Sequence, residues 1–175
     1  CRHYQKHERV PLSFRGPGLD GRTFVLTADL IRDTLQLAQA LPASQLDGII
    51  GVARSGLLPA SVIATYFHLP LWTISPLAKT VHTLGSGYRL GDSGRLPAGR
   101  ILVVDDTACS GNTLREVASA LSKTLNARDI YTAAIYATEE TAPMLDAVGR
   151  VYPKPHYLEW NFANCPFAKD MAFDM

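Results

Sequence analysis

The chain has 175 residues, of which 47% are hydrophobic, and its 17 Lys and Arg nearly balance its 16 Asp and Glu. This composition supports one buried core, and the small net charge with dispersed cations does not predict nucleic acid as a partner. Apolar runs of membrane-spanning length are absent from the sequence. We therefore expect a single α/β domain that binds a small molecule, with no membrane partner.

The cysteines are few and widely spaced. Cys1, Cys109 and Cys165 are an odd set without CxxC spacing, and no signal-peptide pattern accompanies them. These features predict a reducing, cytoplasmic environment. Because the chain opens on Cys1 and not on methionine, we expect it to be a fragment of a longer protein.

The first part of the chain predicts two helices around a short strand. Apolar residues at helical spacing follow Thr27, a good N-cap, and Pro42 stops this first helix. The apolar, β-branched run over residues 46–53 predicts a strand. A second helix is predicted over residues 57–69, with Pro59 in its opening turn.

The middle of the chain predicts a short strand and then a long loop. Residues 71–74 form the strand, and the stretch over residues 75–100 is polar, rich in glycine and interrupted by prolines. Inside a compact domain, a loop of that length is more often a functional lid than a simple connector. We therefore predict a lid over these residues.

The second half of the chain continues the alternation of strands and helices. A strand is predicted over residues 101–104, a helix over about 113–125, a strand over 129–138 and a last strand within 151–160. Such alternation predicts a mostly parallel, twisted sheet covered by helices on both faces. Ligands of these sheets bind outside the carboxyl ends of the strands, where residues 54–56 and 105–113 are expected.

The segment ILVVDDTACSGNTL, residues 101–114, places two adjacent carboxylates directly after an apolar strand. Because buried charge without a partner is costly, Asp105 and Asp106 should face a polar ligand, a cation or solvent. A turn of small residues follows at a helix start, where free backbone N–H groups and the helix dipole favour a phosphate. The turn consists of Ala108, Cys109, Ser110, Gly111, Asn112 and Thr113.

These features together limit the class of ligand that the segment could bind. The absence of a following Gly-Lys-Ser/Thr excludes a Walker A loop. Since the two acids would repel a phosphate, they are expected to face sugar hydroxyls, or a Mg²⁺ held through water, on the same ligand. The segment therefore predicts a phosphorylated sugar.

The same segment resembles the ribose-phosphate signature of the type I phosphoribosyltransferase family, in which two acids lie between an apolar run and a Thr/Ser-Gly-x-Thr loop. Residues 51–60, GVARSGLLPA, are similar to the family's pyrophosphate loop, with Arg-Ser-Gly in place of Arg-Gly-Gly or Lys-Gly-Gly. This resemblance implies that loop amides face pyrophosphate and that a non-proline cis peptide joins Ala53 and Arg54. It also implies the family fold, with a small hood formed by the terminal segments.

Two further segments are similar to the xanthine-guanine and hypoxanthine branch of the family. Residues 84–96, LGSGYRLGDSGRL, stand where that branch has its flexible catalytic loop, and Ser86 and Tyr88 resemble its Ser-Tyr pair. Near the end, HYLEWNFANCPF resembles the hood in which an aromatic residue stacks on the base. Trp160 is the first candidate for this role, and Phe162 is the second.

The resemblance implies transfer of a 5-phosphoribosyl group from phosphoribosyl pyrophosphate to a nitrogen of a nucleobase-like acceptor, with Mg²⁺ as cofactor. The implied catalytic residues are Asp105, Asp106, Arg54 and Tyr88, and both acids hold the metal through water. The implied substrate-binding residues are Ala53, Ser55, Gly56, Thr107, Ala108, Cys109, Ser110, Gly111, Asn112, Thr113, Ser86, Thr138, Trp160 and Phe162. Family members commonly dimerise, so a homodimer and a place in purine salvage are expected.

The acceptor stays open at the level of sequence. Where the 6-oxopurine branch has an acid beside the purine, this chain has Cys109, and where that branch has a lysine for the 6-oxo group, this chain has Thr138. A purine-like base that needs no acid at residue 109 is one alternative. Another is a heterocycle that donates hydrogen bonds to Glu139.

A regulator that binds phosphoribosyl pyrophosphate or a nucleotide without catalysis is the alternative function. Such proteins usually carry a DNA-binding segment or a basic face, and the dispersed Lys and Arg here form neither, so an enzyme is favoured. Purely structural roles compete with the assigned ones at several positions: the two acids as helix caps, Arg54 in an ion pair and Trp160 in the core.

The last residues carry a separate similarity. Residues 170–175, DMAFDM, are similar to the start of a haloacid-dehalogenase-type phosphatase, where an apolar run precedes Asp-x-Asp-Gly. We therefore expect a phosphoribosyltransferase domain over residues 1–169. Residues 170–175 are expected to begin a fused phosphatase that continues past Met175.

Overall fold

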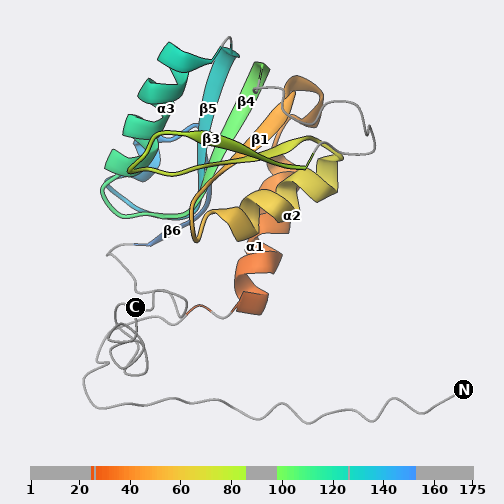
Figure 1. Cartoon of the computed structure of the whole chain (residues 1–175). Coiled ribbons are helices and arrows are strands. Elements are labelled where there is room, and N and C mark those ends of the chain that lie inside the picture. The colour runs from red at the N-terminus through yellow and green to blue at the C-terminus, as the bar shows by residue number, and fades with distance from the viewer. Residues whose placement is uncertain (1–24, 26, 86–97, 126, 153–175) are drawn as a thin grey trace, which may run out of the picture.

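The computed structural model describes residues 25, 27–85, 98–125 and 127–152 (Figure 1). Its strands are β1 (Gly48–Val52), β2 (Leu71–Ile74), β3 (Val81–Gly85), β4 (Gly99–Ala108), β5 (Ala127–Thr138) and β6 (Ala147–Tyr152). Its helices are α1 (Thr27–Ala40), α2 (Leu57–Phe67) and α3 (Asn112–Thr124), with short 3₁₀ turns η1 (Ala43–Gln45) and η2 (Ala142–Met144). In this part of the chain, no helix combines the length and the apolar character that crossing a membrane requires.

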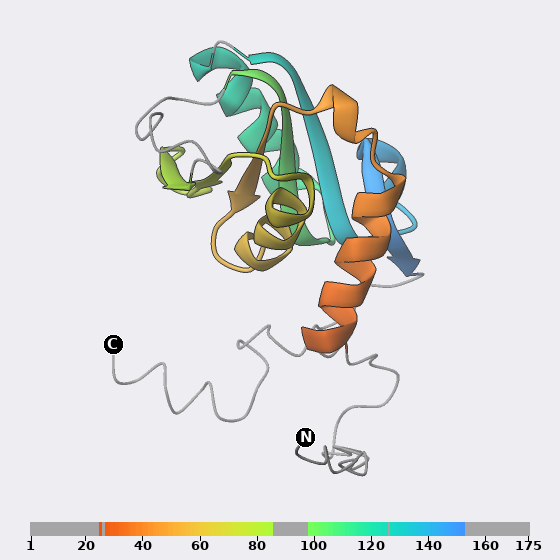
Figure 2. The same cartoon turned by 90° about the vertical axis from the view of Figure 1, so that its right-hand side faces the viewer.

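The strands form one six-stranded sheet in the order β3-β2-β1-β4-β5-β6. Every neighbouring pair is parallel except β2 and β3, which run antiparallel at one edge. Helix α3 covers one face of the sheet, and α1 and α2 cover the other (Figure 1 and Figure 2). The predicted α/β architecture, a mostly parallel sheet between helical layers, is confirmed. The predicted hood falls on terminal residues outside the described part of the chain.

Strand β4 divides its apolar side chains between the two faces of the sheet. Leu102 and Val104 join the core cluster under α1 and α2, whereas Ile101 and Val103 join the cluster under α3. Helix α3 adds a buried stripe at helical spacing, formed by Leu114, Val117 and Leu121. The continuous apolar run of β4 is therefore explained by burial on both sides.

A buried carboxylate ties the first helix to the last two strands. Asp33 of α1 is 2% exposed. Its Oδ2 accepts a 2.8 Å hydrogen bond from the Tyr136 hydroxyl of β5, and its Oδ1 accepts one of 2.7 Å from the Arg150 guanidinium of β6. Because a buried carboxylate without partners would be strongly destabilising, these contacts fix α1 on the sheet.

The prediction of a lid over residues 75–100 is partly wrong. Val81–Gly85 forms β3, which pairs antiparallel with β2, and β4 already begins at Gly99. Residues 82–84 of this edge strand are all exposed, so the sequence lacks the apolar alternation from which a strand is predicted. Residues 86–97, the rest of the predicted lid, lie outside the described residues.

Strand β4 is longer than its apolar run. The strand predicted over residues 101–104 extends to Ala108, so Asp105 and Asp106 lie within the strand and not after it. Parallel pairing with β5 continues as far as Ala108 opposite Ala137, and this ladder carries the polar residues in extended conformation.

The last described strand begins earlier than predicted. The sequence predicts a strand within residues 151–160, whereas β6 starts at Ala147 and the described residues end at 152. Gly149 obscures the pattern, since glycine usually weakens a strand. Here a Cβ on Gly149 would lie 2.7 Å from the Ile135 carbonyl oxygen, so the close approach of β5 explains the glycine.

Candidate functional site

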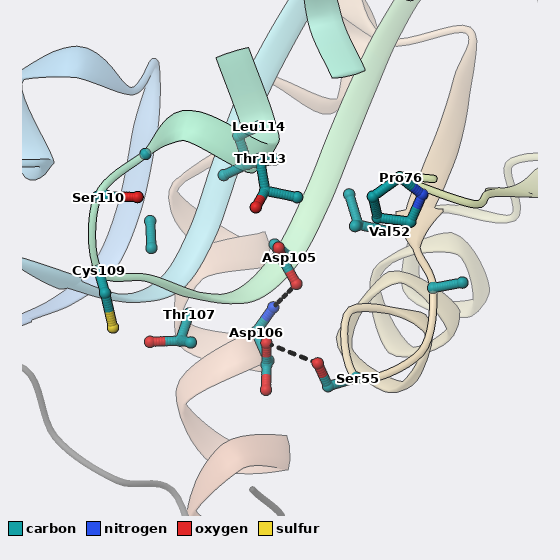
Figure 3. Close-up of a pocket in the computed structure, with 13 residues that line it drawn as sticks. Val52, Ser55, Pro76, Asp105, Asp106, Thr107, Cys109, Ser110, Thr113 and Leu114 are labelled. Carbon is teal, nitrogen blue, oxygen red and sulfur yellow. Dashed lines mark hydrogen bonds between the residues drawn. The ribbon is translucent and has the colours of Figure 1, made fainter. Parts of the chain in front are cut away.

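A pocket of about 300 Å³ opens at the carboxyl ends of β1 and β4, which lie side by side in the sheet (Figure 3). Because β1 leads into α2 on one face and β4 leads into α3 on the other, the two loops diverge and leave a hollow between them. The lining residues are Val52, Ala53, Ser55, Pro76, Asp105, Asp106, Thr107, Ala108, Cys109, Ser110, Gly111, Thr113 and Leu114.

Both acids of β4 are buried at the pocket. Asp105 is 8% exposed and Asp106 is 4% exposed. Asp105 Oδ1 accepts a 2.9 Å hydrogen bond from the Asp106 backbone N–H, and Asp106 Oδ1 accepts one of 3.0 Å from the Ser55 hydroxyl (Figure 3). Burial first, and then the neighbouring charge of Asp106, raise the pKa of the Asp105 carboxyl well above its ordinary value. A charge on Asp105 is therefore costly until a cation or a hydrogen-bond donor enters the pocket.

The loop between β1 and α2 is packed directly against the backbone of β4. A Cβ on Gly56 would lie 2.7 Å from the carbonyl oxygens of Val52 and Val104, and 2.9 Å from Asp105 Cα. Backbone atoms surround the position on each of these sides, so a larger residue would force the two strands apart. Glycine at residue 56 therefore allows the start of α2 to lie close to the carboxylate pair.

The same loop contains the cis peptide. The bond between Ala53 and Arg54 is cis, which confirms the expectation for this position. Ala53 and Ser55 line the pocket, whereas the exposed Arg54 is not among the lining residues. The loop therefore presents backbone and the Ser55 hydroxyl to the pocket.

The loop before α3 presents hydroxyl and amide groups. Gly111 has a φ of 67°, in the left-handed region that favours glycine, and it precedes the first residue of the helix. Gly111 has no side chain to cap α3, so the first turn offers N–H groups to a ligand, with the Asn112 N–H making a long 3.4 Å contact to the Ser110 hydroxyl. Figure 3 shows the hydroxyls of Ser110 and Thr113 on the inner side of this loop and the Cys109 thiol on its outer side. The loop offers the donors that a terminal phosphate needs.

Most of the predicted site lies around this pocket. The predicted residues that line it are Ala53, Ser55, Asp105, Asp106, Thr107, Ala108, Cys109, Ser110, Gly111 and Thr113. Gly56 and Asn112 are next to lining residues in the chain. Thr138 does not line the pocket, because its buried hydroxyl lies 2.9 Å from Thr141 Oγ1 and 3.4 Å from the Cys109 carbonyl oxygen. The predicted residues Ser86, Tyr88, Trp160 and Phe162 lie outside the described part of the chain.

Three lining residues were not predicted, namely Val52, Pro76 and Leu114. Val52 and Leu114 are buried members of the core cluster under α3, so their apolar character gave no sign of a site. Pro76 follows β2, which pairs in parallel with β1 and ends level with Val52 at Ile74. The rule that parallel strands end at one edge of the sheet could have placed it there.

The acidic pair offers the carboxylate oxygens that Mg²⁺ prefers as ligands. Within residues 25, 27–85, 98–125 and 127–152, no group of three or more His, Cys, Asp and Glu side chains could hold a metal by itself. Mg²⁺ usually keeps several waters and binds through one or two carboxylates together with substrate phosphates. Asp105 and Asp106 match that donor set, and a cation beside them would offset the cost of an ionised Asp105.

Comparison with known proteins gives consistent matches. Residues 28–170 match the phosphoribosyl transferase domain family. A xanthine-guanine phosphoribosyltransferase of Idiomarina loihiensis is 33% identical over 104 residues, which are 57% of this chain and 65% of that protein. The match therefore spans slightly less than two thirds of that relative's length.

Solved structures share the fold. A purine phosphoribosyltransferase from Pyrococcus horikoshii has a TM-score of 0.59 and 26% identity, covering 79% of this chain and 92% of its own. A xanthine-guanine-hypoxanthine phosphoribosyltransferase from Helicobacter pylori has a TM-score of 0.60, covering 86% of this chain and 97% of its own. Its identity is 17%, so this likeness concerns the fold alone.

Proposed function

The chain belongs to the type I phosphoribosyltransferase family, and we propose that it transfers the 5-phosphoribosyl group of phosphoribosyl pyrophosphate to a ring nitrogen of a purine base. The observation that carries the proposal is the pocket in which two buried carboxylates face a loop of small residues at the start of α3. A ligand with hydroxyl groups beside a phosphate suits both sides of this pocket. A purine acceptor, and hence a role in purine salvage, is supported by relatives with more than 25% identity that are named xanthine-guanine or purine phosphoribosyltransferases.

The loop before α3 binds the 5-phosphate in this proposal. Ser110 and Thr113 donate hydrogen bonds from their hydroxyls, and the first-turn amides of α3 add N–H donors with the positive end of the helix dipole. Gly111 keeps the approach open, because no side chain covers the helix end.

The carboxylates orient the ribose and stabilise its reacting carbon. Asp105 and Asp106 accept hydrogen bonds from the ribose hydroxyls, and the Ser55 hydroxyl holds Asp106 in position. As the bond between the anomeric carbon and the pyrophosphate oxygen breaks, positive charge develops on the sugar, and the two carboxylates stabilise it. The base nitrogen forms the new bond to that carbon and releases its proton to solvent.

The leaving pyrophosphate needs positive charge and hydrogen-bond donors. Mg²⁺ held at Asp105 and Asp106 would supply the charge that stabilises pyrophosphate as it leaves. The backbone N–H groups of residues 54–56 and the Arg54 side chain are the chain's own donors on that side, whereas the Ala53 N–H donates to the Ile74 carbonyl oxygen at 2.9 Å. The proposed roles of Tyr88 in loop closure and of Trp160 in stacking on the base concern residues outside the described part of the chain.

Pyrophosphate release provides the direct test. The purified protein is incubated with phosphoribosyl pyrophosphate and a panel of bases (xanthine, guanine, hypoxanthine, adenine and orotate), with and without Mg²⁺. We expect release that requires one or more purines and the metal. Asp106→Asn should lower the rate about 10²- to 10³-fold, the usual effect of removing one group that stabilises transition-state charge. Asp29→Asn, which alters a partly exposed ion pair with Arg32 on α1, is the matched control and should leave the rate unchanged.

The outcomes separate the two candidate functions. Binding of phosphoribosyl pyrophosphate without base-dependent release would favour the regulatory, non-catalytic alternative. Pyrophosphate release with orotate alone would agree with the family assignment but contradict the proposal of a purine acceptor. No binding by the unaltered protein would reject the proposed ligand itself.

A further inference from the structure

Two buried threonines lie behind the loop that precedes α3. Thr138 ends β5 and is 7% exposed, and Thr141 begins the turn into η2 and is 3% exposed. The Thr141 hydroxyl lies 2.7 Å from the Ala108 carbonyl oxygen, and the Thr138 hydroxyl lies 3.4 Å from the Cys109 carbonyl oxygen. Ala108 and Cys109 belong to the pocket lining, so these side chains contact the reverse side of the proposed phosphate loop.

The two threonines are also bonded to each other. Each hydroxyl has one proton, and the shortest acceptor for the Thr141 proton is the Ala108 carbonyl oxygen, ahead of the Thr138 carbonyl oxygen at 3.3 Å. Thr141 Oγ1 accepts from the Thr138 backbone N–H at 3.0 Å and lies 2.9 Å from the Thr138 hydroxyl, whose proton it can also accept. The Thr141 backbone N–H lies 3.1 Å from the Thr138 carbonyl oxygen and 3.2 Å from Thr138 Oγ1. With these donors directed at Thr141 Oγ1, its own proton is left to donate to the loop.

The threonines contact the chain at the point where β4 loses its pairing with β5. The parallel ladder between β4 and β5 has its last pair at Ala108 and Ala137, so the residues that follow receive no further support from it. Thr141 therefore supports the chain at the end of this ladder through its hydroxyl, which lies 2.7 Å from the Ala108 carbonyl oxygen. Its methyl group faces the other end of the loop, since a Cβ built on Gly111 would lie 3.9 Å from Thr141 Cγ2.

We propose that Thr141, together with Thr138, is a positioning residue that holds the phosphate loop in its binding conformation. This inference rests on the proposed function, since the loop is taken to bind the 5-phosphate of the sugar. Cys109, Ser110, Asn112 and Thr113 are all exposed, so the loop has little packing of its own on the pocket side. Amides bind a phosphate tightly only when they are already aligned, and the buried hydroxyl supplies that alignment from behind.

The substitution Thr141→Val removes the hydroxyl and keeps the shape of the side chain. The matched control is Thr34→Val, because Thr34 of α1 is also fully buried and donates a 2.6 Å hydrogen bond to the Leu30 carbonyl oxygen. The control loses the same kind of contact in a helix that contributes no residue to the pocket. Thr141→Ser keeps the hydroxyl and tests rescue.

Three measurements are made on each variant. The first is the Kd of phosphoribosyl pyrophosphate, measured by calorimetry in the presence of Mg²⁺. The second is the KM of phosphoribosyl pyrophosphate, here called the sugar, and the KM of the base. The third is amide hydrogen exchange over residues 109–113. We expect Thr141→Val to raise the sugar Kd and KM about tenfold, to leave the KM of the base unchanged, and to speed exchange in the loop. Thr141→Ser should return all three toward the original values, and Thr34→Val should change none of them.

The opposite results would overturn the inference. If Thr141→Val binds the sugar as tightly as Thr34→Val does, or if loop exchange does not change, the threonines only stabilise the fold. If Thr141→Val does not fold, Thr138→Val, which removes the hydroxyl that lies 2.9 Å from Thr141 Oγ1, is measured in the same way. Absence of sugar binding by the unaltered protein would reject the proposed function, whereas normal binding with insensitive variants would reject the positioning role alone.

Discussion

The loops that follow β1 and β4 line the same pocket, but different kinds of contact hold them in place. The loop after β1 is fixed by the absence of a side chain at Gly56, where backbone atoms of both strands leave no room for a Cβ. The loop after β4 is held, in our proposal, by the 2.7 Å hydrogen bond from the buried Thr141 hydroxyl to the Ala108 carbonyl oxygen. The first loop is thus defined by steric exclusion and the second by polar contacts.

This difference has consequences for how each loop responds to change. Steric exclusion by backbone atoms cannot relax without moving a strand, so a substitution there is expected to have a large effect. A hydrogen bond can be weakened, replaced or restored by a related side chain, and its loss has a graded effect. The two carboxylates precede the loop after β4 and contact the loop after β1, where Asp106 is bonded to Ser55 and Asp105 lies next to Gly56.

The largest effect is expected for Gly56→Ala. The added methyl group would lie 2.7 Å from two backbone carbonyl oxygens, so either β1 or β4 must shift. We expect the free energy of unfolding to fall by about 3 kcal/mol, the upper part of the range for overpacking, together with loss of detectable sugar binding. Urea denaturation and calorimetry with phosphoribosyl pyrophosphate measure the two effects.

Gly111→Ala provides the contrast from the other loop. The nearest atoms to a Cβ there are at 3.8 Å or more, and only the positive φ opposes the substitution. Its cost should be about 1 kcal/mol. If Gly56→Ala and Gly111→Ala lowered the free energy of unfolding equally, close packing would not distinguish the loop after β1 from the loop after β4.

The next effect concerns Asp105, which lies next to Gly56. Its raised pKa means that the folded protein binds this proton more tightly than the unfolded chain does. Below the unfolded pKa of about 3.9 the carboxyl is protonated in both states and has no cost. As the pH rises above that value, the unfolded chain loses the proton first, so the contribution of this group to stability falls until the folded carboxyl also ionises.

Asp105→Asn removes this pH-dependent cost. We expect the variant to be more stable than the original protein at pH 7 by about 1 to 2 kcal/mol, and the difference to shrink as the pH falls toward 4. Urea denaturation across this pH range measures it. A less stable variant at pH 7, or a difference that is independent of pH, would contradict the assignment of a costly charge to this position.

The smallest effect is expected for Ser55→Ala in the loop after β1. The substitution removes the 3.0 Å hydrogen bond to Asp106 and leaves the Gly56 packing intact. Because Ser55 is exposed and water can replace the hydroxyl, sugar binding should weaken only about threefold. Ser122→Ala, which removes an exposed hydroxyl bonded to the Ser119 carbonyl on α3, is the control and should leave the Kd unchanged. If Ser55→Ala weakened sugar binding as much as Gly56→Ala does, the Ser55 hydroxyl, and not the close packing at Gly56, would determine the conformation of the loop.

Local chemistry explains which parts of the molecule could be predicted from sequence. The central strands were found because β1 and the apolar part of β4 are buried on both faces, and burial requires the apolar runs that the sequence displays. The carboxylate pair and the small-residue loop were found because charge and glycine next to such a strand have few structural explanations.

Features that depend on distant parts of the chain gave no comparable signal. Strand β3 is exposed at the sheet edge, so its residues need no apolar pattern. Thr141 contacts Ala108 across 33 residues of sequence, and nothing in its neighbourhood distinguishes it from any turn threonine. Such contacts follow from how β4, β5 and η2 are assembled, which sequence periodicity does not encode.

The contacts of Asp33 with Tyr136 and Arg150 can form only late in the assembly of the domain. Its partners Tyr136 and Arg150 are 103 and 117 residues further along the chain. During synthesis α1 emerges from the ribosome well before either partner, so its carboxylate has to stay hydrated until β5 and β6 are made. Contacts of such long separation also slow folding. The contacts of α1 with β5 and β6 can therefore form only after the C-terminal strands have been made.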